Sequence, residues 1–390
     1  MIFEKVKLKE ICSSISDGDH QAPPKVTKGV PFVTISNITN TNQFDFSNTM
    51  FVPQEYYDRL DSKRKAQEGD ILYSVVGSFG IPVYIKETTP FVFQRHIAIL
   101  RPNVDKIVPE FLYYTMLNRD FYMKADAAAL GAAQRTISLT ALRNMEIEIP
   151  HIEVQKKIAK VLASYDDLIE NNQKQIKLLE EAAQRLYKEW FVDLRFPGHE
   201  DVAIVDSVPE GWKKEKLINI ADVQYGFAFD GSLFNSQGKG TPIIRIRNIP
   251  SGTTSDYTTQ EADDQYIVSN GDIVVGMDGE FHINSWSGKK AYLVQRTCKF
   301  TPKKELMRGW LLQAIYEPIK FFEKTVVGAT VAHLGKKHID TIELLTGPDD
   351  LYALFNDLFN KRQLLLNQNI LLKEARDRLL PKLMNGEFEV

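Results

Sequence analysis

Two long stretches of the chain carry apolar residues at alternating spacings of four and three, the pattern of a helix with one buried stripe. In the first stretch the stripe consists of Ile158, Leu162, Tyr165, Ile169, Asn172, Ile176, Leu179, Ala183, Leu186 and Trp190. In the second it consists of Leu354, Leu358, Lys361, Leu365, Gln368, Leu372, Ala375 and Leu379. The first stretch spans roughly 50 Å at 1.5 Å per residue. Because an isolated helix of this kind would expose its apolar stripe, each helix needs a partner.

The nearest partner for each predicted helix is the other one. We therefore expect the two helices to form an antiparallel coiled coil within the chain, and pairing with a separate chain is the alternative. Asn172 and Gln368 occupy equivalent central positions of the two stripes. We expect them to hydrogen-bond and to fix the interhelix register at some cost in stability, unless both rotate out to solvent.

The segments that precede the helices carry strand signals instead, with short runs of Val, Ile, Phe and Tyr between Gly, Pro, Asn and Asp. GVPFVTISNI, residues 29–38, reads as a buried strand whose apolar positions belong to a sheet core. Short helices are expected over residues 108–117 and 306–322. These patterns predict α+β domains with a mostly antiparallel, bulged sheet.

The strand pattern occurs twice, with copies about 200 residues apart. KLKEI at residues 7–11 matches KLINI at 216–220, GVPFVTISNI matches GTPIIRIRNI at 240–249, and EGDILYS at 68–74 matches NGDIVVG at 270–276. FQRHIAI at 93–99 is echoed by VQRTCKF at 294–300, and LGAAQRTISL at 130–139 by VGATVAHLGK at 327–336. Because the order never changes and the period is too long for a solenoid unit, the chain contains two copies of a whole domain.

The predicted organisation is therefore domain, helix, domain, helix. The first domain covers residues 1–150 and is followed by a long helix over 151–191. Residues 192–212, with Pro and Gly turn signals, form the expected linker. The second domain covers 213–347, and residues 348–390 hold the second long helix and a C-terminal tail. If the helices pack antiparallel, a pseudo-two-fold axis relates the two copies.

Composition adds one constraint on function. The 390 residues are 43% hydrophobic and 25% charged, with a formal net charge of −3. Basic and acidic residues are balanced along the chain, so no segment is a basic nucleic-acid module by charge alone. A DNA-binding protein of this composition would have to gather its bases on one face or use positive charge from a partner.

Cysteines and apolar runs point to an ordinary cytoplasmic protein. Cys12 and Cys298 have no CxxC or histidine partner at ligand spacing, so both are expected to be small buried core residues. No apolar run approaches the roughly 20 residues of a membrane span, and residues 1–10 are too charged for a signal peptide.

Motifs for catalysis and cofactor binding are missing from the sequence. It has no GxxxxGKS/T, GxSxG, HExxH or strand-GxGxxG-helix motif, and no Asn-Pro-Pro-Tyr stretch. We therefore assign no catalytic, cofactor-binding or metal-binding residue to this chain.

Polar side chains in predicted loops, present in both copies, suggest binding chemistry. Arg and Lys suit guanine and phosphate, whereas Gln and Asn suit adenine in the major groove. The candidate DNA-binding residues are His20, Gln94, Arg95, His96, Gln134, Arg135, Arg245, Arg247, Gln295, Arg296, His333 and Lys336. For Arg95 and Arg296 a structural ion pair is an equal alternative, and for Asn37 and Asn248 a turn-forming role is favoured.

The two copies differ in side chain where they align in sequence. Thr34 and Ser36 of the first copy stand opposite Arg245 and Arg247 of the second. Two equivalent domains with different polar side chains should read two different short sequences.

These motifs resemble those of the specificity subunit of type I restriction-modification enzymes, over nearly the whole chain. The first half carries SDGDHQAPP, GVPFVTISNI, GDILYSVVGSFG, FQRHIAILRP and the helix entry IPHIEVQKKIAKVLASYDDLIENNQ. The second half carries PEGWK, GTPIIRIRNI, NGDIVV and the closing EARDRLLPKLMNGE. It departs from the family pattern at residues 327–350, which lack a counterpart of Gln134 and of the proline-flanked Glu-Gln helix entry.

The resemblance implies two target-recognition domains, each reading one half of a bipartite, asymmetric double-stranded DNA site. The helices would set the gap between the halves and dock the partner subunits. The implied partners are two methyltransferase (modification) subunits and two restriction (endonuclease and translocase) subunits. The chain would carry no cofactor, while S-adenosylmethionine, ATP and Mg would belong to the partners, which methylate adenine at N6 and cut DNA.

Two other interpretations stay open from the residues. The chain could be a fragment of a fused restriction or methyltransferase enzyme, which would methylate or cleave DNA alone. It could also be a bivalent coiled-coil adaptor, which would bind no DNA sequence selectively even with its partners present.

Overall fold

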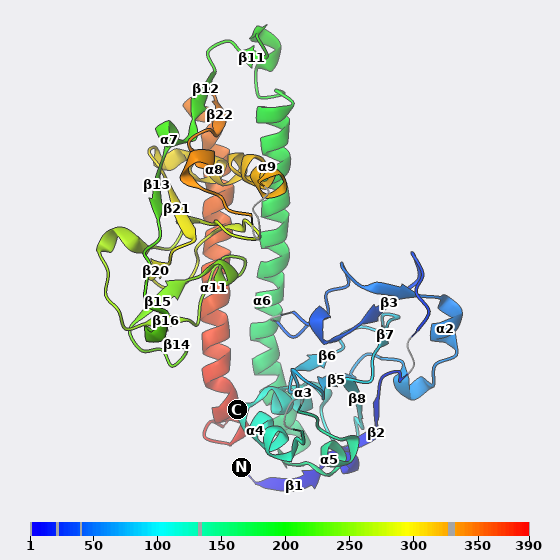
Figure 1. Ribbon diagram of the computed structural model, residues 1–390. Coiled ribbons are helices and arrows are strands. Elements are labelled where there is room, and N and C mark those ends of the chain that lie inside the picture. Colours follow the sequence, from blue (N-terminus) through cyan, green and yellow to red (C-terminus); the bar gives the residue numbers. More distant parts are fainter. Residues whose placement is uncertain (1, 21–22, 40, 132–134, 327–331, 390) are drawn as a thin grey trace. The chain divides into compact units, whose positions relative to one another are not determined.

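The computed structural model describes residues 2–20, 23–39, 41–131, 135–326 and 332–389. The chain forms two compact units: unit one is Met1–Asp167 with Lys373–Val390, and unit two is Leu168–Leu372. Each unit holds a sheet-rich domain and parts of both long helices, α6 (Ile152–Tyr187) and α11 (Tyr352–Met384) (Figure 1). The predicted mixture of sheets and long helices is confirmed.

Three small sheets build the domain of unit one. The largest is antiparallel, in the order β2-β8-β5-β6, with strands Cys12–Asp17, Ile97–Pro102, Ile71–Ser74 and Pro82–Tyr84 and a bulge between Cys12 and Ser14. The second has the order β4-β3-β7, with strands Met50–Val52, Val30–Val33 and Val92–Phe93, of which β3 and β7 are parallel. The third pairs β1 (Phe3–Lys7) with β9 (Glu146–Pro150).

Unit two repeats this strand order and adds one strand at each edge of the second sheet. Its antiparallel sheet is β13-β21-β18-β19, with strands Ala221–Tyr225, Thr297–Pro302, Ile273–Gly276 and Ile283–Ser285. Its second sheet is β14-β16-β15-β20-β17, with strands Phe234–Asn235, Tyr257–Thr258, Thr241–Ile244, Ala291–Leu293 and Ile267–Val268. Strands β15 and β20 are parallel, as β3 and β7 are, and β12 (Lys213–Lys216) pairs with β22 (Glu343–Thr346). The repeat seen in the sequence is therefore a repeat of topology.

The stretch GVPFVTISNI is only in part a strand, which corrects the prediction. Strand β3 ends at Val33, and Ile35–Asn37 form a 3-10 turn. The Asn37 side-chain oxygen accepts a hydrogen bond from the Thr34 amide at 2.9 Å, and Asn248 does the same for Arg245 at 2.8 Å. The turn-forming role predicted for the two asparagines is confirmed.

Short helices cover the sheets, and one of the two predicted helices is broken. In unit one they are α1 (Leu8–Ile11), α2 (Gln54–Asp58), α3 (Pro109–Leu117), α4 (Arg119–Ala128) and α5 (Leu139–Asn144). In unit two they are α7 (Leu217–Ile220), α8 (Arg308–Ala314), α9 (Tyr316–Thr325) and α10 (Lys336–Ile339). The helix expected over 306–322 is split between α8 and α9, because Pro318 has no N–H to continue the ladder of α8 and fits only a first helical turn.

Each domain packs against the start of one long helix and the end of the other. In unit one the core joins Ile158 and Leu162 of α6 to Leu380 and Leu383 of α11. In unit two it joins Phe191, in the π-helical turn Lys188–Val192 that continues α6, to Tyr352 and Phe355 of α11. The two helices therefore run antiparallel within each unit. The pseudo-two-fold relation between the domains stays a prediction.

The predicted stripe holds for α6 and only in part for α11, where Leu365 is buried as expected. In α6, Ile158, Leu162 and Ile169 are all buried, whereas in α11 Leu354 is 44% exposed and its neighbour Phe355 is 1% exposed. Lys361 and Gln368 are likewise exposed, and the residues that follow them, Arg362 and Asn369, are buried. The prediction assumed one partner for α11, but the second domain covers an adjacent face of this helix.

Polar contacts join the two helices near their middles. Asn172 is buried and donates to Gln368 at 3.1 Å and to Asn369 at 2.9 Å. The predicted contact between Asn172 and Gln368 is present. Asn172 also contacts Asn369, which is buried, whereas Gln368 is exposed. Arg362 with Glu180 in unit two, and Arg376 with Asp166 in unit one, add one ion pair between the helices in each unit. The register-setting role of Asn172 and Gln368 stays a prediction.

The expected linker, the two cysteines and the helix lengths complete the description of the fold. The expected linker, 192–212, contains a hairpin of β10 (Ile204–Val205) and β11 (Val208–Pro209). Cys298 is buried, but Cys12 is only partly buried, at the sheet bulge. Within the described part of the chain, no helix has the length and apolarity needed to cross a membrane.

Candidate nucleic-acid interface

In both domains, candidate residues follow the ends of two parallel neighbouring strands. Strands β3 and β7 end at residues 33 and 93, so Thr34 and Gln94 follow them. Strands β15 and β20 end at residues 244 and 293, so Arg245 and Val294 follow them, and the Val294 amide donates to the Ile244 carbonyl at 3.3 Å. The carboxyl ends of parallel strands meet at one edge of a sheet, as ligand sites of parallel sheets do. The fold thus brings Thr34 close to Gln94 in the first domain, and Arg245 close to Val294 in the second.

A glycine at this edge lets two backbone segments touch in each domain. A Cβ atom on Gly18 would lie 2.2 Å from the carbonyl oxygen of Phe93. A Cβ atom on Gly226 would lie 2.0 Å from the carbonyl oxygen of Val294. No other residue fits at these distances, so the loop that follows β7 or β20 is held against the segment of Gly18 or Gly226.

Hydrogen bonds of this loop show which residues of the two domains are equivalent. The Val75 amide donates to His96 at 2.9 Å in the first domain, and the Met277 amide donates to Arg296 at 2.8 Å in the second. The amides of Arg95 and Gln295 each donate to the segment that follows the close-approach glycine, at 3.0 and 2.7 Å. Arg296 is therefore the counterpart of His96.

The sequence match of FQRHIAI with VQRTCKF is therefore wrong by one residue. It paired Arg95 with Arg296 because both copies contain the letters Gln-Arg. The strand register agrees with the hydrogen bonds, since Ile71 pairs with Leu100 where Ile273 pairs with Phe300. The shared letters Gln-Arg hide this correspondence, because they stand one residue later in the loop of the second copy.

The side chains of Asp278, Arg296 and His333 converge in the second domain. The Asp278 carboxylate contacts His333 Nδ1 at 2.6 Å and Arg296 at 2.5 Å. Arg296 and His333 are about half exposed, while the Asp278 side chain is 23% exposed. Arg296 has a φ of 71°, a left-handed conformation that costs energy in a residue with a side chain. The loop hydrogen bonds therefore hold Arg296 in a strained, fixed position.

The first domain has the same backbone with other side chains. A β-bridge joins Val76 to Thr136 where Asp278 is joined to His333. Together with His96, these residues take the place of the Asp278, His333 and Arg296 group without its aspartate and arginine. One backbone arrangement therefore presents two different recognition surfaces.

Asp17 and Asp19 of the first domain contact the side chains of His20, Arg64 and Tyr56. His20 Nε2 lies 2.7 Å from Asp17, and Arg64 lies 3.8 Å from Asp17 and 3.9 Å from Asp19. The Tyr56 hydroxyl donates to Asp19, and burial, this hydrogen bond and the negative charge of Asp19 raise the pKa of Tyr56 to about 12. Tyr56 thus stays a hydrogen-bond donor at neutral pH.

The remaining candidates of the first domain are Gln94, Arg95, His96, Gln134 and Arg135. Arg95 is exposed, and Gln94 and His96 are partly buried. Arg135 pairs with Asp126 at 3.3 Å, and its guanidinium lies 6.0 Å from the centre of the Phe79 ring. Gln134 lies outside the described residues.

The candidates of the second domain differ in how many contacts they make with other side chains of the domain. Arg245 is exposed and lies 5.8 Å from the centre of the Phe234 ring. Arg247 makes two hydrogen bonds to Asp256, of 2.6 and 2.8 Å. Burial would raise the pKa of Asp256, but the hydrogen bonds from Arg247 and Asn248 lower it below the usual range. Gln295 and Lys336 are exposed, and Lys336 begins α10.

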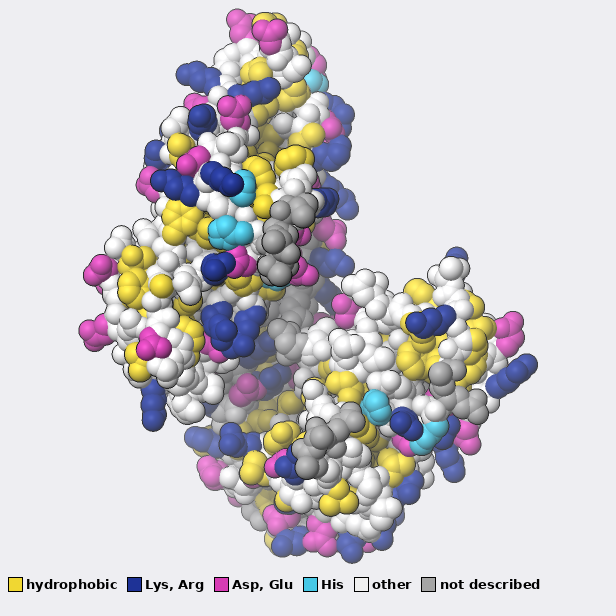
Figure 2. Space-filling model, viewed as in Figure 1, with side chains coloured by type: hydrophobic (Ala, Val, Ile, Leu, Met, Phe, Trp, Pro, Cys, Tyr) yellow, Lys and Arg dark blue, Asp and Glu magenta, His cyan; other side chains and the backbone are white. Residues whose placement is uncertain are grey.

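Positive and negative side chains are mixed on the surface of the chain, as the balanced composition led us to expect. Figure 2 shows Lys and Arg interspersed with Asp and Glu on the visible face, without one continuous basic field. Arg247, Arg296 and Arg135 each contact a carboxylate. A phosphate or base would have to compete with these carboxylates, which favours selective over general DNA binding.

Sequence reasoning missed the residues that hold the candidates in place. Asp278 and Asp256 were missed, because their contacts with His333 and Arg247 come from the fold and not from a local motif. Gly226 lies in a stretch, VQYGFAF, whose aromatic residues suggest a strand. The signal for Gly226 was its position just after a strand, matching Gly18 in the first copy. Among the described residues, no group of three or more His, Cys, Asp or Glu could hold a metal ion.

Known proteins share both the sequence pattern and the fold. A family model, the type I restriction modification DNA specificity domain, matches residues 2–181 and 209–348. The type I restriction enzyme MjaIX specificity subunit of Methanocaldococcus jannaschii is 28% identical over 385 residues, covering 93% of this chain and 87% of that protein. The HindI specificity subunit of Haemophilus influenzae is 22% identical over 447 residues, covering 93% and 97%.

A solved structure supports the fold. The crystal structure of the type I restriction-modification system S subunit from M. genitalium matches with a TM-score of 0.58 at 16% identity, over 98% of this chain and 96% of that one. The family model covers most of the chain in two matched regions, one in each half. This chain therefore belongs to the type I restriction modification DNA specificity family, the specificity subunits of type I restriction enzymes.

Proposed function

We propose that each domain of this chain reads one half of a bipartite, asymmetric DNA site, and that α6 and α11 set the gap between the halves. The observation that carries the proposal is the equivalent edge of the two domains. The same glycine contact and loop hydrogen bonds carry His96, Val76 and Thr136 in one domain and Arg296, Asp278 and His333 in the other. One scaffold with two sets of polar groups suits two different half-sites.

The chain acts in this proposal as the non-catalytic recognition subunit of a larger complex. Its partners are two methyltransferase subunits, which methylate adenine at N6 with S-adenosylmethionine, and two restriction subunits, which use ATP and Mg to translocate and cut DNA. Exposed leucines on the long helices, Leu168, Leu178, Leu364 and Leu371, support docking of the methyltransferase subunits there. The partners supply the positive charge that this chain lacks.

The test is to co-purify the chain with the methyltransferase encoded beside it and to sequence the methylated adenines. The proposal predicts one bipartite motif with a fixed gap. Random methylation, or a single uninterrupted motif, would reject it. Methylation or cleavage by the purified chain alone would favour the fused-enzyme interpretation instead.

A further inference from the structure

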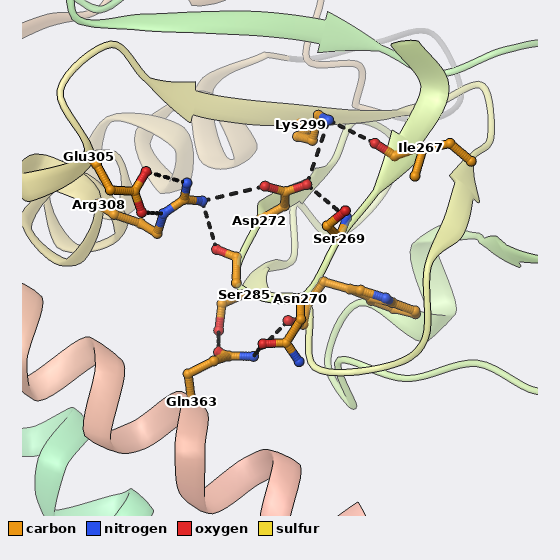
Figure 3. A network of polar contacts seen from close by, with 11 residues as sticks. Ile267, Ser269, Asn270, Asp272, Ser285, Lys299, Glu305, Arg308 and Gln363 are labelled. Carbon is orange, nitrogen blue, oxygen red and sulfur yellow. Dashed lines mark hydrogen bonds and ion pairs between the residues drawn. The ribbon is translucent and has the colours of Figure 1, made fainter. Parts of the chain in front are cut away.

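Polar side chains of α11 attach the second domain to the long helices, and Figure 3 shows one of them, Gln363, with its partners Ser285 and Asn270. Arg362 donates to Glu180 of α6 at 2.7 Å, to Ser285 at 2.6 Å and to Asn284 at 2.9 Å, the last two in strand β19. Only 8% of Arg362 is exposed. One buried guanidinium thus joins α6, α11 and the sheet of the second domain.

Gln363, the next residue of α11, continues the attachment. Its side-chain nitrogen donates to the Trp286 carbonyl at 2.7 Å and to Asn270 at 3.2 Å, and its oxygen accepts from Ser285 at 2.8 Å. Ser285 is 1% exposed and Gln363 is 7% exposed. Hydrogen bonds of fixed direction in a buried site accept one geometry, whereas an apolar contact tolerates sliding.

The network extends toward the candidate DNA-binding turn. Asn284, which accepts from Arg362, donates to the carbonyls of Ile249 and Pro250, both at 3.0 Å. These carbonyls directly follow the 3-10 turn Ile246–Asn248, which carries Arg247. A continuous set of hydrogen bonds therefore leads from the helices to this turn.

The first domain is attached to the helices with other chemistry. Asp166 of α6 accepts from Tyr114 at 2.7 Å, and Asp167 accepts from Lys86 at 2.9 Å. In each unit, polar side chains of a long helix therefore hold the domain, although the residues differ.

We propose that Arg362 and Gln363 are positioning residues that fix the second domain on the helices, so that the protein accepts only one gap length between its half-sites. The inference rests on the proposed function. One extra base pair moves a half-site by about 3.4 Å and turns it by roughly a tenth of a helical turn. A domain held by directional hydrogen bonds cannot follow that change, whereas a loosely attached one can.

The test compares methylated motifs of the wild-type complex with those of Arg362→Met and Gln363→Met. Methylation at sites whose gap is longer or shorter by one base pair should rise about tenfold relative to the normal gap. Both half-site sequences should stay unchanged. Arg362→Lys, which keeps the charge and some of the hydrogen bonds, should restore part of the discrimination. Arg362→Met leaves Glu180 without its ion-pair partner and could fold poorly, whereas Gln363→Met removes no ion pair. The Gln363→Met variant therefore tests the inference even if Arg362→Met does not fold.

Arg308→Met is the matched control. Arg308 is also a largely buried arginine, but it bonds Glu305 at 2.7 Å and the Gly271 carbonyl at 3.0 Å, within the domain (Figure 3). Its loss should destabilise the domain without widening the gap. An unchanged gap in both α11 variants, or equal widening in Arg308→Met, would overturn the inference. If the wild-type complex yields no bipartite motif, the proposed function itself has failed.

Discussion

At the residue scale, backbone contacts carry what is common to the two domains, and a few side chains carry what differs. The turn-forming asparagines could be predicted because the turn propensity of Asn is local. The equivalence of His96 with Arg296 could not, because it depends on hydrogen bonds between segments far apart in sequence. The Asp278 contacts were missed for the same reason.

Gly226→Ala should destabilise the second domain. The added methyl group would meet the Val294 carbonyl, and overpacking of this kind costs about 1–3 kcal/mol. Chemical denaturation of the purified chain measures the free energy of unfolding. Gly231→Ala is the control, because no heavy atom lies within 4 Å of its Cβ position. Equal stability of the two variants would contradict the close approach.

Asp278→Asn should weaken base discrimination in the half-site read by the second domain. The amide carries no charge to hold Arg296, so discrimination there should fall by about 1–3 kcal/mol. Binding of the assembled complex to single-base variants of the site measures this. Asp349→Asn, which removes an exposed partner of Lys304, should leave discrimination intact. If Asp278→Asn discriminates between bases as well as Asp349→Asn does, Asp278 has no positioning role.

At the element scale, the long helices could be predicted well and their contacts less well. The spacing of four and three identified both helices, because it depends only on helical geometry. Most of the buried face of α11 lies one residue later than predicted, because Arg362, Gln363 and Asn369 are polar and a hydrophobic pattern ignores them, whereas Leu365 is buried as predicted. Leu354, which the pattern placed in the buried stripe, is exposed.

Asn172→Leu should destabilise the helix pair. It removes the 2.9 Å hydrogen bond to buried Asn369, and an unsatisfied buried amide costs about 1–3 kcal/mol. The double variant Asn172→Leu, Asn369→Leu should recover that stability. Equilibrium denaturation gives both values. A single variant more stable than wild type would show that this contact does not constrain the helices.

Glutamate at Leu364 and Leu371 should abolish co-purification with the methyltransferase. These side chains are 67% and 65% exposed and lie two turns apart on one face of α11. The melting temperature of the free chain should not change. Leu233→Glu, at an exposed leucine of the second domain, should still co-purify. Retained binding by the double variant would place the docking surface elsewhere.

At the scale of the whole molecule, the duplication could be predicted from five short matches in constant order. Three of those matches fall on strands of the sheets, where burial and pairing restrict the residues. The strand order, the parallel pair in each domain and the division of each helix between two units could not be predicted. They depend on which surfaces pack together, and no local pattern records that.

Equivalent substitutions in the two domains test the central claim most directly. His96→Ala and Arg296→Ala change corresponding positions of the shared backbone, and each variant would be expressed with the methyltransferase before its methylated adenines are sequenced. The account predicts that His96→Ala relaxes one half of the bipartite motif, Arg296→Ala relaxes the other half, and both keep the gap. Relaxation of the same half by both variants, or of both halves by either, would contradict it.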